Sequence, residues 1–509
     1  MSNINKPAMF KRIPVILLAL LLLQPALAHY KARYHVIVDT DGGIDDLRAI
    51  CMMLATPEIE IIAITAVDGI LPAEETANRV RSLLKHYRHE GIPVGIGNSL
   101  PDKAGNSEKA GTPEKSGIPK KAAMAYSIRW VSGGSSTAFE LPPESGSFPD
   151  ATGMILENIK LEEMPVDFIA LGPLTNLASV LREDAGIPDQ VRMVYWYNDA
   201  RDKHDFNYAI DPVSARTLLE SNFDLNRISA AGKQLAKLPG FLAGMDSIAS
   251  PYAQTVRELY TDPAPGFLDH FMATHLADDC VPLYLLYPEH FSTDTTAEQA
   301  LRSVTTAKKE ADLSPLMLAM LDSDQEDPNI LLSRFPVDPG LFQEDVAPIV
   351  PAIIETHGMK EWRIVAITNE FHEHLGIYSI LGAKMGLRAR EYFHVGIDEL
   401  KVLTFAGSKP PVSCLNDGLQ TSTGATLGHG AITLGEGPVM PKARFTFKNR
   451  TIELQIRPDI REKIKSEVGY GVQTYGLDST EYWSYIRKLA LRYWLELDRF
   501  EIFDIQETE

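Results

Sequence analysis

The stretch Val36-Ile37-Val38-Asp39-Thr40-Asp41-Gly42-Gly43-Ile44-Asp45-Asp46 decides the fold of the first half of the chain, because four carboxylates directly follow an apolar β-branched run. The run is typical of a buried parallel strand, with the acids at its carboxyl end. Open α/β sheets bind ligands at that end. Four acids in one place are costly unless hydrogen bonds or a hard cation such as calcium compensate them. The stretch therefore predicts a cation site at the end of a sheet.

The rest of the chain extends this pattern. Short apolar runs alternate with helical segments from about residue 34 to 358, which favours α/β architecture with a doubly wound, mostly parallel sheet. Expected strands are 35–38, 61–66, 94–97, 167–171, 193–197 and 329–334, and expected helices include 46–55, 73–87, 175–181, 212–221 and 342–356. The texture changes near residue 359, where we expect a strand at 362–369 and a helix through Tyr392. We therefore expect a first domain over 34–358 and a second, smaller α+β domain over 359–509.

The N-terminus predicts export. A basic start, an apolar core over residues 15–23 and Ala26-Leu27-Ala28 form the pattern of a signal peptide over residues 1–28. The apolar run is too short to span a bilayer comfortably, so no stable membrane anchor is expected. The mature chain would be periplasmic if the source is bacterial.

Composition narrows the partners. The chain has 509 residues, and its formal net charge of -19 argues against binding the phosphate backbone of nucleic acids. The charge suits a protein that handles cations or neutral, hydroxyl-rich ligands. The three cysteines lie far apart and imply no disulfide framework.

The four acids of the opening stretch can converge on one ion. Asp39 and Asp41 alternate at the strand end, Asp45 and Asp46 open the next helix, and two glycines permit the tight turn between them. One aspartate could then hold both a metal and its water and act as general base. The simpler alternative is an Asp-rich turn whose carboxylates only cap the helix.

Three further segments resemble, in order, the nucleoside hydrolase (inosine-uridine preferring) family. They are residues 169–178 (Ile-Ala-Leu-Gly-Pro-Leu-Thr-Asn-Leu-Ala), residues 205–212 (Asp-Phe-Asn-Tyr-Ala-Ile-Asp-Pro), and residues 277–280 (Ala-Asp-Asp-Cys) followed by Tyr284 and Pro288. The resemblance spans about 34–358. It implies calcium-dependent hydrolysis of the N-glycosidic bond of a nucleoside or related riboside by a metal-bound water, through an oxocarbenium-like state.

The resemblance also implies roles for the matched residues. Calcium (Ca2+) would be held by Asp41, Asp46, the Leu171 carbonyl and Asp278, and Asp41 would be the general base. The substrate would be held by Asp45, Asn176, Asp205, Asn207 and Asp278. The expected partner is a small-molecule nucleoside or riboside, and the family suggests a homo-oligomer.

The nucleobase side departs from the family pattern. Ala277 stands where many members have a His that protonates the leaving base, and His204 and His275 are candidate replacements. Ile70 follows Gly69 where an Asn is common. A Gly-rich strand end is replaced by residues 195–199 (Tyr-Trp-Tyr-Asn-Asp), whose rings either stack on a base or belong to the core.

A second constellation lies in the C-terminal part. His372-x-His374 precedes an apolar helix, and Cys414 opens a Gly/Thr-rich run over 414–428. Two His and one Cys can bind zinc (Zn2+) or another transition metal, although a buried Cys and a His pair without metal is the alternative. The order Phe-His-x-His-Leu-Gly, then Cys-x-x-Asp-Gly-x-Gln-x-x-Thr-Gly, resembles the FmdE-like domains of the formylmethanofuran dehydrogenase system. This resemblance implies a metal-binding module, in which Gly376 stands where many members have a Cys.

Two other functions stay open at this point. Asp39-x-Asp41-Gly also suits a haloacid-dehalogenase-type phosphatase with an Asp nucleophile, although Asp45, Asp46 and Asp278 fit that interpretation poorly. A non-catalytic sugar- or nucleoside-binding protein with a transition-metal-binding C-terminal domain follows if Ala277 and Ile70 signal loss of turnover.

Overall fold

The computed structural model describes residues 32–100, 147–198, 206–231, 238–261, 275–295, 303–322, 331–332 and 334–508, and the structural statements below refer to these residues. The predicted signal peptide, His204 and Asp205 lie outside them. The strand predicted at 329–334 also falls largely outside. Among the helices of this described part, none combines the length and the apolar character needed to cross a membrane.

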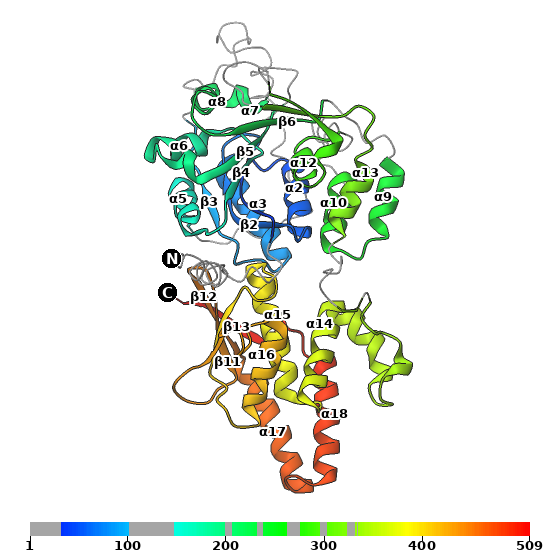
Figure 1. Ribbon diagram of the computed structural model, residues 1–509. Coiled ribbons are helices and arrows are strands. Elements are labelled where there is room, and N and C mark those ends of the chain that lie inside the picture. The colour runs from blue at the N-terminus through cyan, green and yellow to red at the C-terminus, as the bar shows by residue number, and fades with distance from the viewer. Residues whose placement is uncertain are drawn as a thin grey trace, which may run out of the picture.

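An eight-stranded sheet forms the centre of the first part, in the order β3-β2-β1-β4-β5-β6-β8-β7 (Figure 1). Every neighbouring pair is parallel except β7 with β8, so the predicted mostly parallel sheet is confirmed. Strand β1 lies between β2 and β4 and is buried along its whole length. The strands are β1 (Tyr34–Thr40), β2 (Ile59–Ala66), β3 (Val94–Ile96), β4 (Val166–Ala170), β5 (Val191–Tyr197), β6 (Leu225–Ser229), β7 (Phe291–Asp294) and β8 (Ser303–Ala307).

Helices cover both faces of this sheet. One apolar core contains residues of α2 (Ile44–Ala55), α3 (Ala73–His86), α9 (Leu238–Asp246), α10 (Pro251–Thr261), α12 (Cys280–Leu286) and α13 (Ser314–Leu321). The opposite core contains residues of α5 (Ala151–Leu161), α6 (Thr175–Glu183) and α8 (Pro212–Leu219), and the short α7 (Phe206–Ile210) precedes α8. Val36 and Val38 face the first core and Ile37 faces the second. A strand buried on both faces explains the unbroken apolar run of β1.

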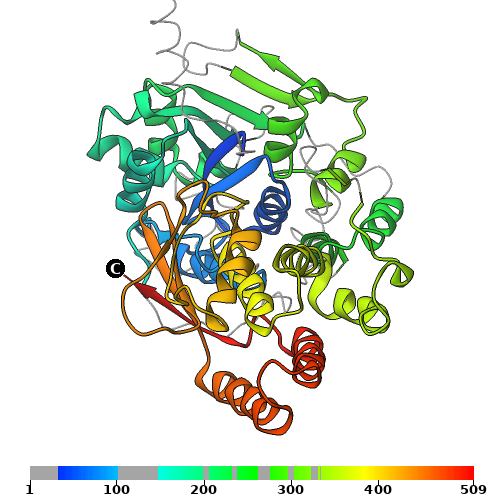
Figure 2. The ribbon, with the colours of Figure 1, turned by 60° about the horizontal axis from the view of Figure 1, so that its bottom comes forward.

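The second part is built on a five-stranded sheet in the order β10-β9-β11-β12-β13, with only β10 and β9 parallel. Its strands are β9 (Lys401–Thr404), β10 (Ile432–Leu434), β11 (Lys442–Phe447), β12 (Arg450–Ile456) and β13 (Phe503–Thr508). Its helices are α14 (Val350–His372), α15 (Ile377–Phe393), α16 (Leu415–Thr423), α17 (Pro458–Tyr475) and α18 (Thr480–Glu496). Helices α15 and α16 pack beside the sheet, and the α17–α18 hairpin extends away from the first part (Figures 1 and 2). The predicted smaller α+β region is confirmed.

Two local predictions near the junction are wrong. Residues 362–369 form part of α14 and not a strand, because Trp362, Val365 and Thr368 are buried at a spacing of three residues, which is one face of a helix. The helix predicted at 342–356 begins only at Val350, since residues 347–349 form a 3-10 turn. Phe335 and Phe342 already pack against the second core, so residues before 359 contribute to it.

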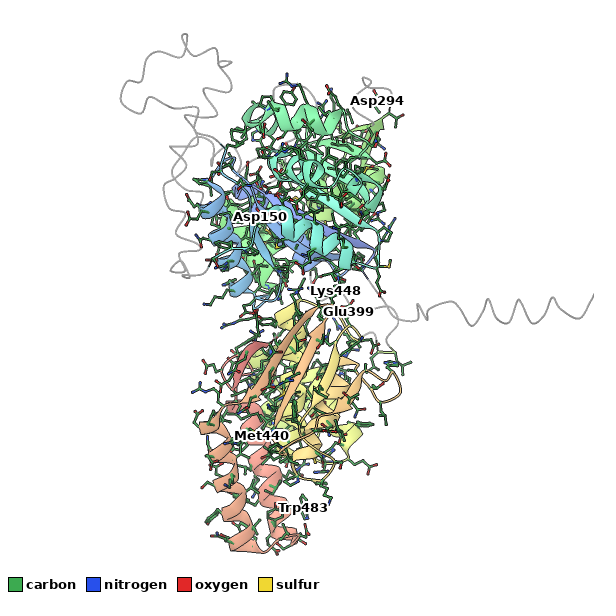
Figure 3. The ribbon with its side chains drawn as sticks, turned by 90° about the vertical axis from the view of Figure 1, so that its left-hand side faces the viewer. Asp150, Asp294, Glu399, Met440, Lys448 and Trp483 are labelled. Carbon is green, nitrogen blue, oxygen red and sulfur yellow. The ribbon has the colours of Figure 1, made fainter. Side chains whose placement is uncertain are left out.

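The two parts meet at the amino-terminal edge of the first sheet (Figure 3). His35 and Glu60 are the second residues of β1 and β2, and Glu162 lies just before β4. Lys448, from the turn between β11 and β12, places its Nζ 2.7 Å from Glu60 and forms an ion pair with Glu162. The His35 Nδ1 lies 3.3 Å from the Glu162 carboxylate. These four residues are called the interface ion cluster below.

Neighbouring contacts extend this junction. Arg388 of α15 donates to both carboxylate oxygens of Glu90 at 3.0 Å, and the Gly91 N–H donates to the Tyr392 carbonyl at 2.8 Å. The His89 ring lies 4.2 Å from the His394 ring, and burial lowers the pKa of His89 to about 4. All these residues precede β3 or belong to the second part. The carboxyl-terminal edge of the first sheet therefore points away from the junction.

We predict that Lys448→Met lowers the free energy of unfolding at pH 7 by roughly 3 kcal/mol, because it leaves buried acids without their cation. Burial raises the pKa of Glu162, but hydrogen bonds and charge from His35 and Lys448 outweigh it and lower this pKa to about 2. The stabilisation by Glu162 is thus complete above its ordinary pKa of 4.5 and is lost as the pH falls towards 2. Urea denaturation at pH 7 and pH 3 should show a smaller difference at pH 3.

The control is Lys463→Met, since Lys463 is 44% exposed and its nitrogen lies 3.8 Å from Glu496. We expect this substitution to change the free energy of unfolding by less than about 0.5 kcal/mol. Equal effects of the two substitutions would contradict a structural role for the interface ion cluster.

Candidate active site

The turn after β1 brings the acids of the opening stretch together. Gly42 has φ +80, and a Cβ there would lie 2.7 Å from Thr76 Oγ1, so the position requires glycine. The chain then starts α2 at Ile44, with Asp45 and Asp46 in the first turn. Gly43 is the residue before the helix and makes no side-chain cap. The predicted tight turn is therefore present.

Asp278 joins Asp45 and Asp46 from a distant part of the chain. One carboxylate oxygen from each of the three lies within 4.8 Å of the others, and all three residues are buried. Asp278 lies just before α12, and its Oδ1 has no hydrogen-bond partner. The Asp46 Oδ1 accepts from Thr40 Oγ1 at 2.5 Å and from the Asp41 N–H at 3.1 Å. The three aspartates Asp45, Asp46 and Asp278 are called the acid cluster below.

Asp41 lies against the acid cluster and is enclosed by glycine backbone. Its Oδ2 accepts from the Ile70 N–H at 3.1 Å. A Cβ at Gly69 would lie 2.1 Å from that same oxygen, and a Cβ at Gly172 would lie 3.0 Å from the Asp41 Cβ. Sequence reasoning missed the spatial part played by both glycines. The only signal was their position just after β2 and β4.

The electrostatics of this edge call for a cation. Burial, followed by repulsion from neighbouring carboxylates, raises the pKa of Asp41 and of Asp278 well above the usual range. The same two causes raise the pKa of Asp45 to about 7. The donor set consists of oxygen atoms, one of which is buried without a partner. Hard cations such as calcium prefer such ligands, so these residues fit the predicted ion.

Asn176 has a different place from the one predicted. Its Nδ2 donates to Asp39 Oδ1 at 2.8 Å and to the Ala66 carbonyl at 3.1 Å, and the residue is buried. Thr65 Oγ1 donates to the same Asp39 oxygen at 2.6 Å. The amide of Asn176 thus supports Asp39 from behind. We correct its expected contact with substrate to a positioning role.

Leu171 and Asn207 lie together at the same edge. The Leu171 N–H donates to the Asp39 carbonyl at 2.8 Å, which continues β4 alongside β1. Asn207, in α7, donates from Nδ2 to the Leu171 carbonyl at 2.6 Å and to the Tyr197 carbonyl at 3.1 Å. The carbonyl expected to bind metal is therefore in contact with a residue expected to bind sugar. Asp205 is outside the described residues.

The nucleobase side is partly clarified. Trp196 is fully buried and its Nε1 donates to the Gly172 carbonyl at 3.2 Å, so this ring belongs to the core. Tyr195 is only partly buried and meets the Tyr284 ring edge-on, with centroids 6.1 Å apart. The Ala277 side chain is apolar and buried, and it supplies no acid for the leaving group.

A buried ion pair that the sequence did not reveal fixes the turn carrying Asp278. Arg48 donates to Asp279 through Nε at 3.0 Å and Nη2 at 2.7 Å, and both side chains are fully buried. The same guanidinium reaches the His275 carbonyl at 3.3 Å. The Asp278-Asp279 pair therefore divides its work, with one acid facing the cluster and the next facing α2.

The second predicted metal centre is not assembled in the same way. His372, His374 and Cys414 line one cavity, and the rings of the two histidines have centroids 4.2 Å apart. However, the described residues include all three, and their ligand atoms do not form a group within 4.8 Å. Another such group, His35 with Glu60 and Glu162, already holds the Lys448 ammonium.

Comparisons with known proteins place both parts of the chain. The family model described as inosine-uridine preferring nucleoside hydrolase matches residues 36–330, and the model described as FmdE, molybdenum formylmethanofuran dehydrogenase operon, matches residues 371–494. The chain is 30% identical over 161 residues to Uridine nucleosidase 1 of Arabidopsis thaliana, covering 31% of this chain and 43% of that protein. It is 26% identical over 283 residues to the pyrimidine-specific ribonucleoside hydrolase RihA of Salmonella paratyphi A, covering 51% and 81%.

Among solved structures, the purine-preferring ribonucleoside hydrolase from Gardnerella vaginalis matches with a TM-score of 0.43 and 16% identity, covering 57% of this chain and 98% of that one. The match at residues 371–494 confirms the expected fusion with an FmdE-like region. The match at residues 36–330 takes in more than half of the 509 residues, including β1, the acid cluster and α7. The chain therefore belongs to the inosine-uridine preferring nucleoside hydrolase family, a family of glycosidases that act on N-glycosyl compounds.

Proposed function

We propose that this chain hydrolyses the N-glycosidic bond of a nucleoside or related riboside with the help of a bound calcium ion. The convergence of Asp45, Asp46 and Asp278 within ligand distance carries the proposal. The relatives named as uridine nucleosidase and ribonucleoside hydrolase support the substrate class. Asp41, Asp46, Asp278 and the Leu171 carbonyl are the residues that would hold the ion.

Each residue then has a chemical part. The ion supplies a fixed positive charge that offsets the repulsion among the carboxylates and favours ionisation of water. Asp41 accepts the proton of the attacking water as general base, and the Ile70 N–H fixes the orientation of its carboxylate. Asp45, Asn207 and Asp278 bind sugar hydroxyls. Carboxylates around the sugar stabilise the positive charge that develops in an oxocarbenium-like transition state.

The alternatives raised by the sequence are less favoured. A non-catalytic binding protein is not favoured by a match to a family of hydrolases. A phosphatase that uses an Asp39 or Asp41 nucleophile leaves the convergence of Asp278 with α2 unexplained.

We expect Asp41→Asn to lower kcat by about 10²- to 10⁴-fold, the usual range for losing a general base, with a smaller effect on KM. The assay is release of reducing sugar from uridine, cytidine, inosine and guanosine. Asp189→Asn is the control, because Asp189 is exposed before β5 and should retain full activity. Unchanged activity of Asp41→Asn would remove this residue from the mechanism.

Removal of calcium should lower both activity and the midpoint of thermal unfolding, since the acid cluster would lose its compensating charge. Elemental analysis should find about one calcium per chain, and Asp278→Asn should lose it. The ion must displace protons from carboxylates whose pKa is raised, so added calcium should raise the midpoint more at pH 7.5 than at pH 5.5. An equal rise at both pH values, or full activity after chelation, would contradict the assignment.

The transition metal expected at His372, His374 and Cys414 stays a prediction outside the proposed function. The contact of His372 with Asp417 is of the kind that orients metal-binding histidines. The distances among the three ligand atoms do not support a ready-made site. The same elemental analysis reports whether this metal is present.

We also propose that the chain is exported and loses residues 1–28, on the strength of the N-terminal pattern alone. Mass spectrometry of chain recovered from the periplasm of an expressing bacterium should give a mature N-terminus at His29. A chain that keeps residues 1–28, or that stays with the cytoplasm, would contradict export. The homo-oligomer suggested by the family likewise stays a prediction.

A further inference from the structure

A large cavity lies in the second part, far from the acid cluster. Its volume is about 780 Å³, and it lies between the end of α14, the start of α15 and the α17–α18 hairpin. Met440 and Trp483, two of its lining residues, mark its place away from the first sheet in Figure 3. Most of the other lining side chains are apolar or aromatic, among them Tyr378, Val468 and Ile486. Small-molecule sites commonly have about 300–1,000 Å³ and such a lining.

One end of the cavity carries an unused hydrogen-bond acceptor. His372 Nδ1 lies 2.6 Å from Asp417 Oδ2, and this contact assigns the ring proton to Nδ1. Nε2 then presents a lone pair. That nitrogen is buried and has no hydrogen-bond partner, and the side chain is only 10% exposed. A buried polar atom without a partner costs roughly 1–3 kcal/mol, so a ligand that satisfies it gains affinity.

Gly376 keeps the space beside this nitrogen open. Its φ of -103 and ψ of 136 suit any residue, so the backbone does not require glycine here. A Cβ at this position would lie 3.2 Å from His372 Nε2 and 2.9 Å from Ser379 Oγ. Both Gly376 and His372 line the cavity. The absent side chain therefore gives a ligand access to the acceptor.

We propose that this cavity binds an aromatic small molecule with a single N–H or O–H group, which donates to His372 Nε2 while the ring packs between Met440 and Trp483. The hydrogen bond sets the orientation of the ligand, and burial of its apolar body supplies most of the affinity. This ligand takes the place of a metal ion at His372, whose expected partners are not within ligand distance. The proposal does not depend on the hydrolysis proposed for the first part.

The test is calorimetric titration of the full-length mature chain with indole, which has one N–H donor and does not ligate metals readily. Benzofuran is the matched probe, because it has the same two-ring shape and no donor. We expect indole to bind roughly three- to tenfold more tightly than benzofuran, the factor expected for one hydrogen bond. His372→Phe should remove this preference while leaving benzofuran binding nearly unchanged.

Gly376→Ala is the second variant, and it should weaken indole binding more than about tenfold by closing the space beside Nε2. Tyr470→Ala is the control, since Tyr470 is exposed on α17 and does not line the cavity. Circular dichroism checks that each variant is folded. The proposal is overturned if indole does not bind, if indole and benzofuran bind equally, or if zinc binds in a His372-dependent manner and displaces indole.

Discussion

Repulsion among buried carboxylates is the constraint on which the carboxyl-terminal edge of the first sheet depends. Asp45, Asp46 and Asp278 lie within ligand distance in a water-poor setting, where like charges interact strongly. Neutral donors such as the Ile70 N–H and the Thr40 hydroxyl relieve only part of it. The approach of Asp278 is secured by the Arg48–Asp279 ion pair, so a structural pair holds a functional acid in place. The arrangement is stable only with protons or a cation among the acids.

Much of this edge could be predicted from sequence because its signals are local. A β-branched run, four acids and two glycines specify a strand, a turn and a helix start within about a dozen residues. The convergence of Asp278 could not be derived in that way. It was expected only from resemblance, since no local pattern states which distant segments meet.

The failures have physical reasons of the same kind. Asn176 was expected at the substrate, but both of its amide N–H groups are used in holding Asp39 and the Ala66 carbonyl, which only the fold reveals. Residues 362–369 contain several β-branched side chains, but their burial follows helical spacing against the second core. Lys448 stands in a short turn with no motif around it. Its role arises entirely from the acids of another domain.

The position of the interface ion cluster has a consequence for how such a fusion can arise and operate. The added domain is attached where the parallel strands begin, so its gain or exchange during evolution leaves entry to the reaction site unchanged. A chain that discarded the domain would expose His35, Glu60 and Glu162 and would need a new positive group to replace the ammonium. The two ligand sites also open in different directions. A base or sugar released by the first must equilibrate with the surrounding solution before it meets the second, and direct transfer between them is not available.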